Sequence, residues 1–345
     1  MNKARLKPLL QFVLLLGIGV AFIWFSFKDI TEEEKTSIIS ALKSADYFWV
    51  GISLGVSFLS HFLRAWRWNL LLEPSGHSTK RLNALCHVLI GYFANYGIPR
   101  MGEISRCTLA AKYDKVPFEV GLGTVITERI VDLLLFFIIF LLTLFLQFQK
   151  LGALANEYVF EPMSKRFAVL THNPVLLVVL ILVMIGGVIG LIMLRKKINN
   201  LLTGKIGGMI KGILDGLSSI MKLKRPSAFI LMSLGIWLCY FYSLYICMLA
   251  IPGTANLGQS VALALLLFGT LGVMFSAGGL GAYPAILGGI LMASYGVAKA
   301  DAFALPWLSW TGQFALVVAL GTISLIVLPL YNKNKKDELS QPTAE

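Results

Sequence analysis

The sequence has little charge and no polar stretch long enough to hold a soluble domain. Charged residues make up 14% of the 345 positions, whereas soluble domains carry about 25%. Hydrophobic residues make up 57%, and the mean hydropathy is +0.76. We therefore expect one all-α polytopic membrane domain, a helical bundle over residues 1–332. The polar end of the chain, 333–345, is predicted to be a disordered cytoplasmic tail.

The chain also has few of the residues that bind metals or form disulfides. Its four cysteines lie in or beside apolar segments and form no CxxC pair, so we expect buried free thiols: Cys86, Cys107, Cys239 and Cys247. The histidines show no ligand spacing. His61 and His87 could face a cavity, but we expect them to have satisfied structural roles. The sequence thus predicts no metal and no cofactor.

The net charge of +12 does not predict nucleic-acid binding, because the basic residues cluster between apolar spans as topology signals do. They concentrate at the amino terminus, in 195–225 and in the tail. This asymmetry places both termini in the cytoplasm of a multi-pass protein of the cytoplasmic membrane. About 20 apolar residues cross a bilayer, which predicts about eight crossings: 8–27, 47–72, 119–148, 174–194, 227–251, 257–275, 281–298 and 303–330.

Two further segments have the pattern of amphipathic helices. Thr31–Ala45 begins with three glutamates and is expected to lie on the outer surface. Residues 198–223 carry apolar side chains at helical spacing, a glycine every four residues and a basic end. Such a helix suits an anionic membrane leaflet or close packing against another surface.

Two apolar segments are interrupted, one in each half of the chain. The first reads Gly-Tyr-Phe-Ala-Asn-Tyr-Gly-Ile-Pro-Arg-Met-Gly-Glu over 91–103, and a helix cannot run undisturbed through Ile98-Pro99. We expect 82–98 and 101–112 to form a re-entrant hairpin. The second is the glycine-rich stretch 269–284. Such a pair indicates a transporter's binding site, while two packing kinks without a ligand are the alternative.

Charged residues flank the first break and are expected to converge. Arg64 and Arg67 are three apart, and Glu128 and Asp132 are four apart, so each pair shares a helix face. If both pairs converge with Arg100, Glu103, Arg106 and Arg129, five arginines would meet three carboxylates. The excess positive charge would suit a phosphate. A structural ion-pair network is the alternative, as are interfacial anchors for Arg64 and Arg67 beside tryptophans. The candidate substrate-binding residues are Arg64, Arg67, Asn95, Pro99, Arg100, Glu103, Arg106, Glu128, Arg129, Asp132, Gly278, Gly279, Gly281 and Tyr283.

These motifs carry a resemblance to a known family. Ile98–Glu103 with Arg106, then Glu128-Arg129-Ile130-Val131-Asp132, then Gly278-Gly279-Leu280-Gly281 are similar to the transmembrane region of lysylphosphatidylglycerol synthases, over about 8–330. In the bifunctional synthases this region is the flippase part, and a separate soluble domain performs lysyl transfer. The resemblance implies lipid translocation without aminoacyl transfer. Many relatives carry an acidic residue after the glycine-rich turn, where this chain has Tyr283-Pro284.

We therefore expect a flippase-like, non-enzymatic membrane protein that binds and translocates a phosphate-bearing, anionic lipid or lipid-linked intermediate. Its predicted partners are the bilayer and a membrane lipid. Two alternatives stay open. One is a membrane transferase that uses paired carboxylates on a lipid-linked substrate. The other is a non-catalytic membrane partner in envelope biogenesis that docks through 198–223. The sequence leaves the lipid class and the oligomeric state open.

Overall fold

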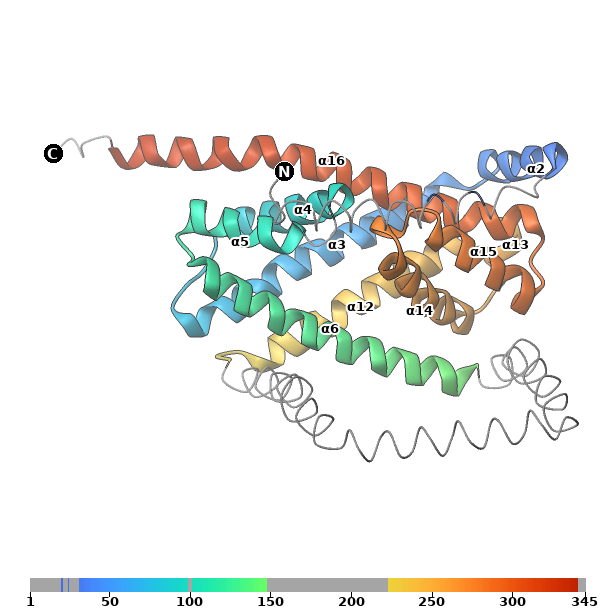
Figure 1. The fold of residues 1–345 in the computed structure, drawn as a ribbon, viewed down its shortest axis with the longest axis horizontal. Helices are drawn as coiled ribbons and strands as arrows, with labels where there is room; N and C mark the ends of the chain where they lie inside the picture. The colour runs from blue at the N-terminus through green and yellow to red at the C-terminus, as the bar shows by residue number, and fades with distance from the viewer. Residues whose placement is uncertain (1–19, 21–23, 25–30, 99–100, 148–222, 341–345) are drawn as a thin grey trace, which may run out of the picture. The chain divides into compact units, whose positions relative to one another are not determined.

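The computed structural model describes residues 20, 24, 31–98, 101–147 and 223–340 (Figure 1). Every regular element among them is a helix, which confirms the predicted all-α class. The chain divides into two compact units, Met1–Thr143 with Ile220–Glu345 and Leu144–Ser219, and the description below concerns the first. Almost all of the predicted span 8–27, and all of 174–194 and 198–222, lie outside the described residues.

Four of the described helices are long and apolar enough to cross a membrane. They are α3 (Tyr47–Leu72), which the short helix η1 (Glu73–Ser75) extends, α6 (Phe118–Leu146), α12 (Pro226–Met248) and α16 (Lys299–Ser340). Large apolar side chains such as Phe137 are exposed, while charged side chains such as Glu128 are buried. This is the reverse of a soluble protein and suits a lipid surrounding.

The helices α3 and α12 pack side by side in opposite directions. The Asp46 amide donates to the Ala250 carbonyl at 2.9 Å. Nearly two helical turns further along α3, the Ser53 hydroxyl donates to the Ser243 carbonyl at 2.7 Å. This pairing fixes the face of α3 that is turned into the protein.

The first interrupted segment forms the predicted helical hairpin. Its arms are α4 (Arg81–Gly97) and α5 (Met101–Asp114). Two glycines let the arms touch, because a Cβ on Gly102 would overlap the Gly91 carbonyl. The Gly102 amide also donates to the Asn95 side-chain oxygen at 2.7 Å. Pro99 and Arg100, at the tip, lie outside the described residues.

The sequence predicts that the second interrupted segment crosses the membrane twice, over 257–275 and 281–298. The structure has two shorter helices there. Its arms, α14 (Gln259–Phe275) and α15 (Ala282–Tyr295), have 17 and 14 residues, the same lengths as α4 and α5. At about 1.5 Å per residue, neither arm reaches the roughly 30 Å of a bilayer core. The helix η4 (Ala277–Gly279) lies between the arms. The break rests on glycines in positive-φ conformations, Gly278, Gly279 and Gly281.

Both hairpins pack along α16, at different parts of it (Figure 1). In the first hairpin, Asn83 bonds to Asn332 and Phe93 packs on Gly321. In the second, Tyr283 lies 3.2 Å from the Ser309 hydroxyl, and Gly288 lies against Phe303. The hairpins therefore approach from opposite ends of α16, and their tips meet near its middle.

Aromatic residues of α16 join the two tips. The Trp310 indole donates to the Gly278 carbonyl at 2.9 Å. Phe314 packs edge-on against Tyr96 of α4, with ring centroids 4.9 Å apart. A Cβ on Gly278 would also overlap the Tyr96 ring. The two breaks, far apart in sequence, are thus neighbours in space.

The remaining elements lie at the ends of α16. The helix α2 (Glu32–Lys43) begins with a capping box at Thr31, and Lys299 bonds to Glu34 at 2.9 Å. The short α13 (Pro252–Ala255) follows α12. At the other end, α16 continues to Ser340, so much of the stretch interpreted as a disordered tail is helical.

Candidate functional site

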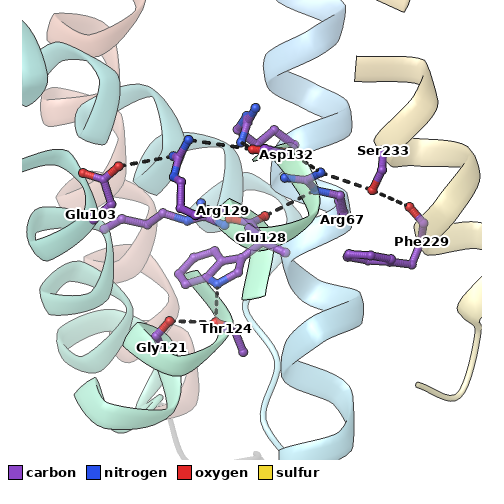
Figure 2. Close-up of polar contacts among 12 residues, drawn as sticks. Arg67, Glu103, Gly121, Thr124, Glu128, Arg129, Asp132, Phe229 and Ser233 are labelled. Carbon is purple, nitrogen blue, oxygen red and sulfur yellow. Dashed lines mark hydrogen bonds and ion pairs between the residues drawn. The ribbon is translucent and has the colours of Figure 1, made fainter. Parts of the chain in front are cut away.

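The centre of the site is a carboxylate on α6 that joins two arginines of α3. Asp132 accepts hydrogen bonds from Arg64 at 2.9 Å and from Arg67 at 2.8 Å. Arg67 also donates to Ser233 of α12 at 3.1 Å (Figure 2). Arg64 is 3% exposed and Arg67 is fully buried, so the interpretation of both as interfacial anchors is wrong. They face the interior because α12 covers this face of α3.

A second carboxylate lies one turn earlier on α6. Glu128 is fully buried and accepts from Arg106 of α5 at 2.7 Å. The Arg67 Nε atom lies 3.5 Å from its other oxygen. The Arg106 guanidinium lies over the Trp68 ring, 3.8 Å from the centroid. The four-residue spacing of Glu128 and Asp132 thus brings three arginines from two helices to one face of α6.

The outer edge of the site is a more exposed pair. Arg129 lies 3.3 Å from Glu103 and 3.7 Å from Asp132. The Arg129 side chain is 46% exposed and that of Glu103 is 26% exposed. This pair connects the buried cluster to the surface of the described structure (Figure 2).

Arg64, Glu103, Arg106 and Arg129 line a small, partly open pocket with a cavity volume of about 20 Å³. A cavity of this size holds about one water molecule, so the pocket must widen to admit a headgroup. Its walls come from α3, α4, α5 and α6. The lining residues are Arg64, Val88, Gly91, Tyr92, Asn95, Gly102, Glu103, Arg106 and Arg129.

Several buried polar atoms of the site have no hydrogen-bond partner among the described residues. They include Nε and Nη2 of Arg106, Nε of Arg64 and one oxygen of Glu103. A buried donor without a partner is costly. Four arginines and three carboxylates meet here, which gives the described cluster one excess positive charge. Free guanidinium donors with excess positive charge are suited to an anion such as phosphate.

The structure brings most of the predicted site residues together, but not all of them. Asn95 lines the pocket. The glycines of the second break and Tyr283 are at the other hairpin tip, which meets the first hairpin through Tyr96 and not through the charged cluster. Within the described chain, no group of three or more His, Cys, Asp or Glu residues is arranged to hold a metal ion.

Sequence reasoning missed the residues that support the arginines. Trp68 is fully buried, donates to Thr124 at 2.8 Å and forms the base under Arg106. The anchor alternative for Arg64 and Arg67 places the neighbouring tryptophans at the membrane interface. The signal was present, since Trp68 follows Arg64 by four residues and so shares its face. Tyr240 of α12, which accepts from Arg64 at 2.9 Å, had no such signal.

The two central histidines also differ from expectation. His61 and His87 are buried, yet neither ring has a hydrogen-bond partner among the described residues. His61 packs on Tyr92, which lines the pocket, with centroids 4.8 Å apart. His87 lies 3.6 Å from Asp114. They are therefore not the satisfied core residues that the sequence suggested.

Fold and site together define an all-α membrane protein with buried arginines and carboxylates beside a broken helix. Comparison with known families agrees, because the family model described as the lysylphosphatidylglycerol synthase TM region matches residues 11–321. The chain belongs to this family.

Among curated proteins, a UPF0104 membrane protein of Methanocaldococcus jannaschii is 26% identical over 149 residues. The alignment covers 42% of this chain and 41% of that relative, so the chain matches less than half of its length. No solved structure gives a significant match.

Proposed function

We propose that this protein binds the phosphate of a lipid or lipid-linked headgroup in the arginine pocket and carries it across the cytoplasmic membrane, without chemical conversion. The observation that supports this best is Arg106. It is held in place by Glu128 and Trp68, while two of its nitrogens have no hydrogen-bond partner among the described residues and its side chain lines the pocket. A positioned guanidinium with free donors is suited to a phosphate oxygen.

Two further features support an anion at this place. The α5 helix begins at Met101, and Gly102 in its first turn lines the pocket. A helix amino terminus carries partial positive charge, and this charge acts on the pocket although the Gly102 amide itself is bonded to Asn95. The excess positive charge of the cluster acts in the same direction. The family resemblance supports a lipid as the carrier of this phosphate, since the corresponding region of the bifunctional synthases is their flippase part.

The carboxylates Glu128 and Asp132 are assigned a positioning role. Both accept hydrogen bonds from buried arginines, which holds the guanidinium groups in one orientation before a headgroup arrives. Such preorganisation lowers the cost of ordering side chains on binding. Both carboxylates are paired with guanidinium groups, Glu128 through one hydrogen bond to Arg106 and a 3.5 Å contact between its other oxygen and Arg67. This pairing favours transport over the transferase alternative.

Reconstitution into liposomes with fluorescent phospholipids tests the proposal. The protein should speed the transfer of a labelled anionic phospholipid between leaflets, measured by the fraction that dithionite quenches. Arg106→Gln should lower the rate by about 10- to 100-fold, the loss expected for a charged hydrogen bond. Arg129→Gln, at a pocket residue that is half exposed, should lower it without leaving a buried charge unpaired.

Arg225→Gln is the matched control, because Arg225 is 65% exposed and its partner Glu73 lies outside the site. Its rate should equal that of the wild type. Absence of accelerated transfer for every phospholipid class, in a preparation that unfolds cooperatively on heating, would refute the proposed function.

A further inference from the structure

A stripe of buried polar residues runs along α3 and continues from the arginine pocket. Ser53, Ser57, Ser60 and His61 precede Arg64 at spacings of three and four, so they share one face. All are 5% exposed or less. The opposite face carries exposed apolar residues such as Phe58 and Leu59. We call the four residues before Arg64 the α3 polar face.

Small residues between helices often serve packing alone, but His61 points to more. It is 95% buried, and neither of its ring nitrogens has a hydrogen-bond partner among the described residues. It stands one turn from Arg64 and one turn from Ser57. Its ring packs on Tyr92, which is itself a wall of the pocket. Only the rings of His61 and Tyr92 thus lie between the α3 polar face and the pocket.

Beyond His61, one side chain of α16 closes the polar face. Gln313 accepts a hydrogen bond from Ser57 through its side-chain oxygen and donates to Ser243 of α12 through its amide at 3.3 Å. It therefore bridges α3 and α12. In the sequence of α16, Gln313 lies between Trp310 and Phe314, the two residues that contact the hairpin tips. The bridge is at the level where the hairpins meet.

We propose that the α3 polar face is the route by which a headgroup leaves the arginine pocket toward the amino-terminal end of α3, and that the Ser57–Gln313–Ser243 bridge is its closed gate. This rests on the proposed function. The lining beyond the arginines consists of neutral hydroxyl, imidazole and amide groups. These neutral groups can solvate a phosphate without binding it tightly. Weak binding suits a transport route, because the headgroup must also be released.

Cysteine accessibility tests the route without requiring transport. Ser60→Cys places a nearly isosteric thiol on the polar face, and the four native cysteines are buried, so the wild type gives the background. The probe is the anionic, membrane-impermeant sulfonatoethyl methanethiosulfonate, added to either side of sealed vesicles. The matched control is Leu59→Cys, at the neighbouring position on the exposed apolar face. Ser60→Cys should be modified, and Leu59→Cys should not.

Opening the gate should raise the rate of modification. Gln313→Ala removes both hydrogen bonds of the bridge, and Ser243→Ala removes one of them with the loss of a single hydroxyl. Either change should speed modification of Ser60→Cys, roughly tenfold for Gln313→Ala, because two neutral hydrogen bonds shift a two-state equilibrium by about that factor. The increase should appear when the probe is added from the side where α3 begins.

The outcomes separate the two proposals. If Ser60→Cys stays unmodified alone and together with Gln313→Ala or Ser243→Ala, the polar face only packs helices against one another and the route is refuted. If the wild type transfers lipid at a rate that Gln313→Ala and Ser243→Ala leave unchanged, the gate is refuted while the proposed function stands. Modification of Ser60→Cys with no lipid transfer by the wild type would instead refute the proposed function.

Discussion

Asp132 holds two buried arginines of α3 against α6, and removing its charge should destabilise the protein strongly. Asp132→Asn keeps the shape but turns an acceptor of hydrogen bonds from Arg64 and Arg67, at 2.9 and 2.8 Å, into a neutral amide. Each charged hydrogen bond contributes about 1.5–3 kcal/mol. Breaking a buried ion pair by removing one partner costs about 3–5 kcal/mol. We expect a loss of about 3–5 kcal/mol.

The buried cysteines provide the assay. All four are free and buried in the folded protein, so a thiol-reactive fluorogenic dye reports unfolding when the detergent-solubilised protein is heated. The matched control is Glu73→Gln, which breaks an ion pair of similar length, 2.9 Å, whose arginine is 65% exposed. Such a pair contributes about 0–1 kcal/mol. The Tm of Asp132→Asn should fall by at least about 5 °C, and that of the control by about 3 °C at most.

Equal Tm values for the two variants would refute the reasoning. That result would mean that Arg64 and Arg67 remain solvated or exchange partners freely, and that no desolvated network links α3 to α6. The preorganised guanidinium groups on which the proposed function depends would then be absent. An increase in stability for Asp132→Asn would have the same consequence.

Three more predictions concern the hairpins and α2. Gly102→Ala should disrupt the first hairpin and abolish transport, since its Cβ would overlap the facing α4 backbone, whereas Gly123→Ala has open space and should be neutral in the same thermal assay. Trp310→Phe removes the indole donor to the second tip and should cost about 1 kcal/mol of stability. A hydrogen bond from Lys299 lowers the pKa of Glu34, so the link between α2 and α16 is present at neutral pH and weakens as the pH falls through that lowered pKa. Protease cleavage near α2 should rise there, and Glu34→Gln should show the same rise at neutral pH.

Much of the helical architecture could be predicted from the sequence. The bounds of α3 match the predicted span 47–72, because a long apolar run with an Asp46 cap leaves few other conformations. The first break was equally clear, since proline ends a helix locally. The sequence also predicts the second break, but it predicts that each arm crosses the membrane. The arms α14 and α15 are too short for that. Apolar composition shows that a segment suits lipid, and it does not show how far the segment reaches.

The candidate site was predictable as a set of charges but not as a geometry. Helical spacing placed Glu128 with Asp132 and Arg64 with Arg67, because side chains four or three apart share a face whatever packs against them. It could not show that Arg106 pairs with Glu128 over the Trp68 ring. Nor could it separate the second break from the charged cluster. Both depend on contacts between separate helices, which the periodicity within one helix does not show.

By itself, the sequence determined that this chain is a helical membrane protein with two broken segments and charged residues beside the first. These properties follow from composition, from proline and glycine, and from helical periodicity, all of which act over a few neighbouring residues. Only the tertiary structure decided that the hairpins meet along α16, that Gln313 bridges α3 and α12, and that Arg106 keeps free donors in a pocket. Those features arise from contacts between separate helices, from 22 positions apart for Arg106 and Glu128 to 256 for Ser57 and Gln313, where packing and partner choice depend on the whole fold.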